Sequence, residues 1–291
     1  MALDRESLKR ETHFTSALRR MKKNKGALAG TIIIFSIILT AVFARYISPY
    51  DPLEQDFGNM FLSPSIEHPF GTDQYGRDVA TRIIYGARYD LMIGVAVVSI
   101  HFVVGVSLGL IAGFYGGIIE TVIMRVVDVM LSIPSVVLAL TIAGFLGGGI
   151  QNVIIAIGAI GWRDYTRLVR AEVLSARENV FVEAAQAIGC SDLRIIVRHI
   201  MPYVIAPVIA YTSLGIATAI LWSAALSFLG LGAQPPTPEW GAMLADGREF
   251  MQDAWWIATF PGLAIMVTII GFNFFGDALR SALDPKSDRR I

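Results

Sequence analysis

Residues 171–202 read AEVLSARENVFVEAAQAIGCSDLRIIVRHIMP, and this segment of mixed polar and apolar residues separates two long apolar runs. Elsewhere the chain is strongly apolar, because 54% of its 291 residues are hydrophobic and only 16% are charged. Apolar residues gathered into long runs are typical of chains that cross a bilayer. The sequence therefore predicts an all-α polytopic membrane protein with one sizeable polar insert.

Six of the apolar runs reach the length of about 20 residues that a membrane-spanning helix requires. These expected spans are 27–47, 89–113, 128–147, 150–170, 203–229 and 255–280. The first follows a basic tail at 1–26, and the other five belong to a core at 89–281. Between the spans lie an outer loop rich in Pro, Gly and Asp (48–88), the polar insert (171–202) and a second outer loop (230–254), and a short tail at 282–291 ends the chain.

The Lys and Arg residues are concentrated on one side of this arrangement. Of the 24 in the chain, eight precede the first span, six lie between residues 163 and 198 and four follow residue 279, whereas the two outer loops carry four between them. Because cytoplasmic loops carry such an excess, we expect both termini and the insert to be cytoplasmic, as six spans allow. The formal net charge is zero, so nothing indicates a nucleic-acid partner.

Cofactor chemistry within this chain is not indicated. Cys190 is the only cysteine and the four histidines are far apart in sequence, so neither a metal site nor a disulfide is expected. The sequence also has no G-x-x-x-x-G-K-[ST] phosphate loop, which predicts that the chain itself does not hydrolyse ATP.

The insert is expected to form two short helices that meet at a bend. An apolar stripe marks the first helix and comprises Val180, Val182, Ala184, Ala185 and Ile188. Gly189 is expected to end it, since glycine readily takes the left-handed conformation of a C-terminal cap. Ser191 and Asp192 offer an N-cap for the second helix, and Pro202 suits the first turn of the next span. Short amphipathic helices dock in grooves of partner proteins, although this pattern also suits a helix pair on the membrane surface.

Glycine and proline have local interpretations within the spans. Gly105, Gly109 and Gly113 recur at four-residue spacing and leave one helix face flat for close approach of another backbone. We interpret this face as tight packing within the chain, with a seam to a second subunit as the alternative. Proline removes a backbone donor and kinks helices, and it occurs in or beside the apolar segments at Pro134, Pro207 and Pro261.

Ionisable side chains at membrane depth usually face the protein interior or water. His101, in the second span, is interpreted as a neutral, hydrogen-bonded packing residue. Asp128 is expected to pair with Arg125 three residues earlier, with a place on the substrate path as its alternative role. No other pore-lining residue is assigned.

Three stretches of the chain resemble one family. Glu183-Ala184-Ala185, followed by Gly189, matches the core of the EAA motif, through which permeases of ABC importers meet their ATPase subunits. The stretch from Ala187 to Pro202 resembles the dipeptide/oligopeptide/nickel branch of that family. Two outer stretches resemble the same branch and read His68-Pro-Phe-Gly-Thr-Asp-Gln-Tyr-Gly-Arg-Asp-Val79 and Leu226-Ser-Phe-Leu-Gly-Leu-Gly-Ala-Gln-Pro-Pro-Thr-Pro-Glu-Trp-Gly-Ala-Met-Leu244. In this order they resemble the C-type partner of two related permeases.

The resemblance implies a type I ABC importer permease fold in the cell (inner) membrane. The chain would form half of the translocation path for peptides, most simply di- or oligopeptides. The implied partners are a second homologous permease, two ATPase subunits that bind ATP and Mg²⁺, an extracytoplasmic solute-binding protein and membrane lipid. The residues implied for ATPase coupling are Glu183, Ala184, Ala185, Gly189, Ser191 and Asp192, with the two small alanines entering a narrow groove.

Two other functions fit a six-span chain less well. A stand-alone secondary transporter would use His101 and Asp128 as a proton relay, but the intramembrane charge is sparse and the insert would have no purpose. An intramembrane enzyme would require a nucleophile beside a base. Ser99 and Ser107 lie two and six positions from His101, and a helix does not align such residues.

Overall fold

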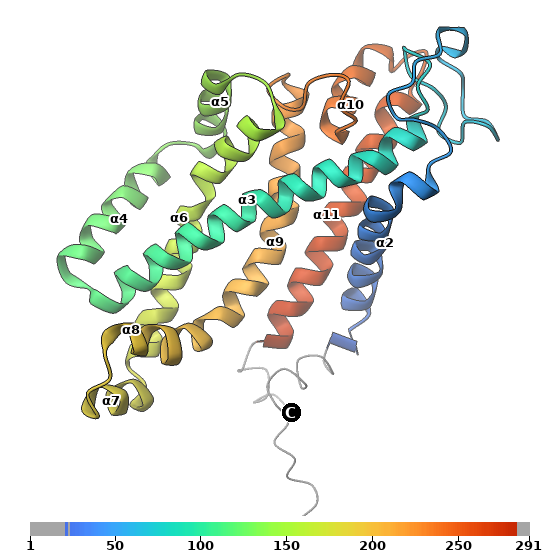
Figure 1. The fold of residues 1–291 in the computed structure, drawn as a ribbon. Helices are drawn as coiled ribbons and strands as arrows, with labels where there is room; N and C mark the ends of the chain where they lie inside the picture. The colour runs from blue at the N-terminus through green and yellow to red at the C-terminus, as the bar shows by residue number, and fades with distance from the viewer. Residues whose placement is uncertain (1–20, 23, 284–291) are drawn as a thin grey trace, which may run out of the picture.

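The structure, a computed structural model, describes residues 21–22 and 24–283 of the chain (Figure 1). Most of the predicted tails, 1–26 and 282–291, lies outside these residues. The regular elements of the described part are helices. The α-helices are α2 (Lys25–Ile47), α3 (Val79–Tyr115), α4 (Gly117–Ser132), α5 (Ser135–Leu146), α6 (Ile150–Arg177), α7 (Val180–Ala187), α8 (Asp192–Ile195), α9 (Met201–Phe228), α10 (Trp240–Gly247) and α11 (Trp256–Leu283).

Four helices in the described residues are long and apolar enough to cross a membrane. They are α2, α3, α11 and the continuous helix Asp192–Phe228, which joins α8 to α9. The bent pair α4 and α5 meets the same criterion if it counts as one span, which makes five. The remaining expected span, 150–170, lies in α6, where charged residues from Arg163 onward lower the hydropathy. Six spans and cytoplasmic termini therefore stay predictions.

Several helix boundaries differ from the sequence-based expectation, and α4 begins at Gly117 rather than at residue 128. The second span was expected to begin at residue 89, but α3 begins at Val79, where the Asp78 carboxylate accepts a hydrogen bond from the backbone N–H of Thr81 at 2.7 Å. The third expected span, 128–147, is two helices that bend by 89° at Ile133 and Pro134. Pro134 thus separates two helices where the sequence predicted only a kink within one span, whereas α9 and α11 continue through Pro207 and Pro261.

Glycine allows a close helix contact between α3 and α6. A Cβ at Gly105 would lie 2.4 Å from the Cβ of Tyr165, and one at Gly109 would lie 2.6 Å from the Cβ of Val169. Gly113 meets Val173 in the same way at 2.7 Å. The glycine face therefore packs against a helix of the same chain, as the favoured interpretation predicted.

The long helices separate two groups of short elements (Figure 1). At one end, α7 and α8 connect α6 to α9, and the first turns of α2 and the last turns of α11 point toward this end. At the other end, α10 packs with the segment that links α2 to α3. The molecule thus has one end built around the insert and one end built from the two outer loops.

Candidate functional site

The insert folds as the local sequence predicts around Gly189. We call residues 178–202 the docking segment. Gly189 has φ of +77°, its N–H donates to the Gln186 carbonyl at 2.9 Å, and the N–H of Cys190 donates to the Ala185 carbonyl at 3.0 Å. This pair of bonds is a Schellman motif, which satisfies the last carbonyls of α7. Ser191 is the N-cap residue of α8, but its hydroxyl makes no capping hydrogen bond.

One face of the docking segment is buried in the chain's own core. Its inward side chains join a cluster with residues of α3, α6 and α9, and they are Val182, Ala185, Ile195, Ile196 and Ile200. Ile200 is fully buried and Val182 is 1% exposed. The docking segment therefore packs firmly against the long helices and is not a detached loop.

The exposed side of the docking segment carries large apolar side chains among polar ones. Val180, Ile188 and Leu193 are 78%, 80% and 71% exposed, and Val197 is 49% exposed. The expected single stripe is thus wrong, because Val180, Ala184 and Ile188 are exposed while Val182 and Ala185 are buried. An eight-residue helix bent by its cap presents two apolar faces, and periodicity alone does not separate them.

The residues expected to couple to an ATPase divide between these faces. Glu183, Ala184, Ser191 and Asp192 are exposed, and Gly189 forms the bend. Ala185, expected to enter a partner's groove, is instead 3% exposed and packs inward. Its small size therefore lets α7 approach the core of this chain.

Three arginines on α6 tie the neighbouring helices together. Arg163 donates to the Met130 carbonyl and to the Ser135 hydroxyl, on the two sides of the break between α4 and α5. Arg170 binds Glu120 of α4, with Nε to Oε1 at 2.6 Å. These arginines recur every seven residues, so they share one helix face. From the sequence, these arginines were used only to predict the orientation in the membrane, although their seven-residue spacing already indicated a shared helix face.

Arg177 completes the set at the C-terminal end of α6. Its Nη1 donates to the Gly113 carbonyl at 2.9 Å. This carbonyl belongs to the last turn of α3, where backbone acceptors lack partners within the helix. The docking segment begins directly after Arg177, so the end of α6 is held at the point where the insert departs.

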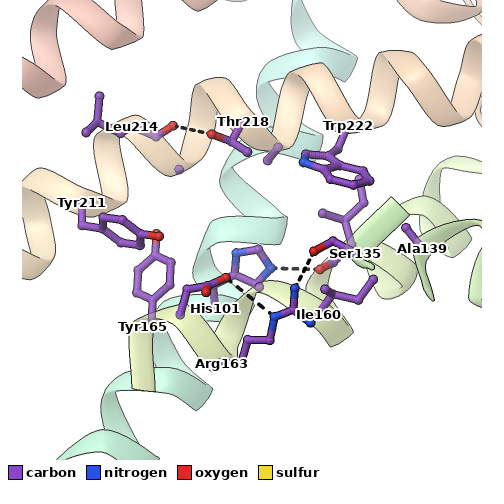
Figure 2. Close-up of a pocket in the computed structure, with 15 residues that line it drawn as sticks. His101, Ser135, Ala139, Ile160, Arg163, Tyr165, Tyr211, Leu214, Thr218 and Trp222 are labelled. Atoms are coloured by element: carbon purple, nitrogen blue, oxygen red, sulfur yellow. Dashed lines mark hydrogen bonds and ion pairs between the residues drawn. The ribbon is translucent and has the colours of Figure 1, made fainter. Parts of the chain in front are cut away.

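A cavity of about 160 Å³ lies between α3, α5, α6 and α9 (Figure 2). His101 and Arg163 contribute to its lining, together with Asp164, Tyr165, Tyr211, Thr218 and Trp222. Tyr165 and Tyr211 meet edge to face with ring centroids 4.9 Å apart. The cavity is thus lined by aromatic rings and a few polar groups, which is the usual character of a small-ligand pocket.

The two ionisable residues singled out from the sequence have separate surroundings. His101 is 8% exposed, and its Nε2 lies 3.0 Å from the Ile157 carbonyl, which agrees with a hydrogen-bonded packing role. Asp128 is exposed on α4 and forms no ion pair with Arg125 in the described structure, so the expected pairing is wrong. Within the described residues, no hydrogen bond or ion pair joins Asp128 to His101.

The first outer motif, 68–79, forms an ion-pair network. Asp73 binds the Arg77 Nε at 2.7 Å, with both side chains almost fully buried, and the Arg82 Nε lies 3.6 Å from the same carboxylate. His68 Nδ1 lies 3.0 Å from Asp78 Oδ1, beside the cap of α3. These charges hold the loop against the start of α3.

The second outer motif packs on the first. Arg82 donates to the carbonyls of Pro52 and Pro236, at 3.0 and 3.3 Å. The indole N–H of Trp240 donates to the Ile83 carbonyl, and the backbone N–H of Trp240 donates to Asp90. The outer loops therefore contact each other rather than merely capping helix ends.

A match to two family models covers most of the chain. Residues 105–289 match the binding-protein-dependent transport system inner membrane component, and residues 12–64 match the N-terminal TM domain of oligopeptide transport permease C. The chain therefore belongs to the family of binding-protein-dependent transport inner-membrane components, which are multi-pass membrane permeases of ABC importers.

Among curated relatives, the dipeptide transport system permease protein DppC of Alkalihalophilus pseudofirmus is 50% identical over 93% of this chain and 89% of its own length. The di/tripeptide transport system permease protein DppC of Pseudomonas aeruginosa is 43% identical over 90% of this chain and 89% of its own length. The glutathione transport system permease protein GsiD of Escherichia coli is 44% identical over 92% of this chain and 89% of its own length.

A solved structure agrees in fold. The MetNI methionine ABC transporter, in an inward-facing conformation, matches 69% of this chain and 96% of its own matched chain with a TM-score of 0.55. The sequence identity is 18%, so this likeness concerns the fold alone. It agrees with the expected type I importer permease fold.

Proposed function

We propose that this chain is the membrane-spanning permease subunit of an ATP-driven importer of small peptides and forms half of the translocation path beside a second homologous permease. The names of the relatives support the substrate class, because they specify dipeptides, di/tripeptides and glutathione, itself a tripeptide. The proposal includes six spans with cytoplasmic termini. Its other partners are two ATPase subunits that bind ATP and Mg²⁺, and an extracytoplasmic binding protein.

The two-faced docking segment carries this proposal. Its inward face packs in one cluster with α6 and α9, while Val180, Ile188 and Leu193 are each more than 70% exposed on the rest of the segment. Several large apolar side chains exposed on one short segment suit a protein interface. A partner that moves this segment would move α6 and α9 with it, and we propose that this partner is the ATPase.

Introducing a negative charge among the exposed apolar side chains tests the proposed contact with the ATPase. Ile188→Asp and Leu193→Asp leave the inward face intact, so the chain should fold and reach the membrane normally. We expect each variant to lose most co-purification of the ATPase subunits, and ATP-dependent peptide uptake by membrane vesicles to fall about tenfold or more. Ile188→Val is the matched control and should behave as the wild type. Wild-type co-purification and uptake in both Asp variants would refute the docking role.

The shape of the docking segment offers a second test. Gly189→Pro requires φ near −65° where the chain has +77°. Ala185→Leu overfills the inward cluster and should push α7 outward. We expect both variants to abolish uptake while the protein stays in the membrane. Normal uptake in either variant would contradict a coupling role for the bend.

A direct measurement separates this proposal from a stand-alone transporter. Vesicles containing the chain without any ATPase should show no peptide flux under a proton gradient. Vesicles with the complete transporter and its binding protein should take up peptide only with ATP. Flux driven by the gradient alone would overturn the importer proposal.

A further inference from the structure

The cavity of Figure 2 lies where the docking segment acts on the membrane helices. Two of its walls are α6 and α9, and these are the helices that enter and leave the docking segment. The other walls, α3 and α5, do not continue into it. Any displacement of the docking segment relative to α3 therefore changes the shape of this cavity.

Asp164 brings a weakly compensated negative charge to the cavity. It lies within the expected span 150–170 and its side chain is 45% exposed. Its one cationic neighbour in the described residues is the Arg163 Nε, at 3.8 Å, which exceeds hydrogen-bond distance. A charge at membrane depth normally faces a partner or a ligand path.

The neighbouring positive charge, Arg163, is buried, and its terminal nitrogens bind groups other than Asp164. The terminal nitrogens of Arg163 donate to the Met130 carbonyl and the Ser135 hydroxyl, and its side chain is 5% exposed. Arg163 therefore stabilises the break between α4 and α5, while its buried Nε has no hydrogen-bond partner in the described residues and lies 3.8 Å from the Asp164 carboxylate. Asp164 is the more exposed of these two charges, at 45% against 5%.

The aromatic lining also favours a cation. Tyr165 and Tyr211 form one wall and Trp222 lines another part, as Figure 2 shows. The faces of aromatic rings attract cations, most strongly when the cation is an ammonium in a partly dry site. The Tyr165 hydroxyl is buried and has no hydrogen-bond partner in the described structure.

We propose that this cavity binds the N-terminal residue of a transported peptide, with the α-ammonium group on Asp164 and the first side chain among the aromatic rings. This proposal rests on the proposed import of peptides, and it assigns the cavity as the subsite for the peptide N-terminus. A volume of about 160 Å³ is below the 300–1,000 Å³ of a pocket that encloses a drug-sized ligand, so it holds one end of the peptide. A metal cation is disfavoured, since one carboxylate is too few hard ligands.

Equilibrium binding to the complete transporter without its binding protein tests the subsite. The probes are Ala-Ala and N-acetyl-Ala-Ala, which differ in the ammonium group. We expect Asp164→Asn to weaken Ala-Ala binding about tenfold and to leave N-acetyl-Ala-Ala unchanged, because only the charged amine loses a charge-assisted bond. Asp164→Glu should recover part of the affinity. Asp128→Asn, an exposed carboxylate outside the cavity, is the matched control.

Each outcome has a defined meaning. An equal loss of affinity for both peptides in Asp164→Asn, or no loss, would overturn the assignment. It would also be overturned if Na⁺ or K⁺, compared at constant ionic strength, competed with Ala-Ala in the wild type but not in Asp164→Asn. Failure of the wild-type complex to bind Ala-Ala would also overturn it. These results leave the importer proposal intact, because ATP-dependent uptake with the binding protein is measured separately.

Discussion

Glycine at three positions of α3 sets how closely α6 packs. At Gly109 an added Cβ would lie 2.6 Å from the Cβ of Val169 and 2.9 Å from the Thr166 carbonyl oxygen. The second contact is with backbone, so relief requires α6 to move. We predict that Gly109→Ala lowers the free energy of unfolding by about 1–3 kcal/mol, measured by thermal unfolding in detergent.

The control for this prediction is Gly144 on α5. A Cβ there meets nothing within 4 Å, so Gly144→Ala should be neutral or stabilise slightly through helix propensity. Equal destabilisation by the two substitutions would show that the α3–α6 contact does not limit packing.

The burial of the ion pair between Asp73 and Arg77 predicts how much it contributes to stability. Asp73 and Arg77 have side chains 4% and 3% exposed, and their ion pair measures 2.7 Å. Asp73→Ala would leave both Arg77 and Arg82 without this carboxylate in a buried site. We predict a loss of about 3 kcal/mol in stability, because breaking a buried pair leaves an uncompensated charge. A midpoint of thermal unfolding within 1 °C of the wild type would contradict this prediction.

At the scale of elements, α6 is held by arginines of unequal importance. The Arg163 side chain is 5% exposed, whereas Arg170 and its partner Glu120 are 32% and 22% exposed. Solvent screens the second interaction much more than the first. We predict that Arg163→Met costs about 2–3 kcal/mol and Arg170→Met less than about 1 kcal/mol, by thermal unfolding. The reverse order would mean that the break between α4 and α5 does not depend on Arg163.

Short-range chemistry made several of these elements predictable. Pro134 signalled a kink and Gly189 signalled a cap, because both act through their own backbone conformation. The start of α3 was missed because Arg82 and Arg88 make its first turns too polar for a span, although Asp78 is a standard cap residue. Which side chains of α7 are buried depends on the residues that α3 and α6 place beside it, and the periodicity of the sequence does not contain this information. The cavity was likewise hidden, since four separate helices build it.

At the scale of the whole molecule, the end built from the two outer loops contains a pair of buried carboxyl groups besides its buried arginines. Glu239, the cap residue of α10, is fully buried, and Asp90 of α3 is fully buried beside it. Burial raises the pKa of the Glu239 carboxyl above its ordinary value, although the N–H groups of Ala242 and Gly241 oppose the shift. The folded outer end therefore retains a proton that the unfolded chain releases. This stabilisation is complete below the ordinary glutamic acid pKa and is lost as pH rises through the folded value.

We predict that the thermal midpoint of the purified chain falls as pH rises from 5 to 8, and that Glu239→Gln flattens this slope because the amide carries no charge to bury. Part of the slope should remain, since burial also raises the pKa of Asp246 on the same helix. Glu54→Gln is the matched control, because this exposed carboxylate acts on neither Glu239 nor Asp246, so its removal should leave the slope unchanged. An unaltered slope in Glu239→Gln would mean that Glu239 stays ionised in the folded protein, and the acid pair would then require a cation, which the described residues do not place within ion-pair distance of it.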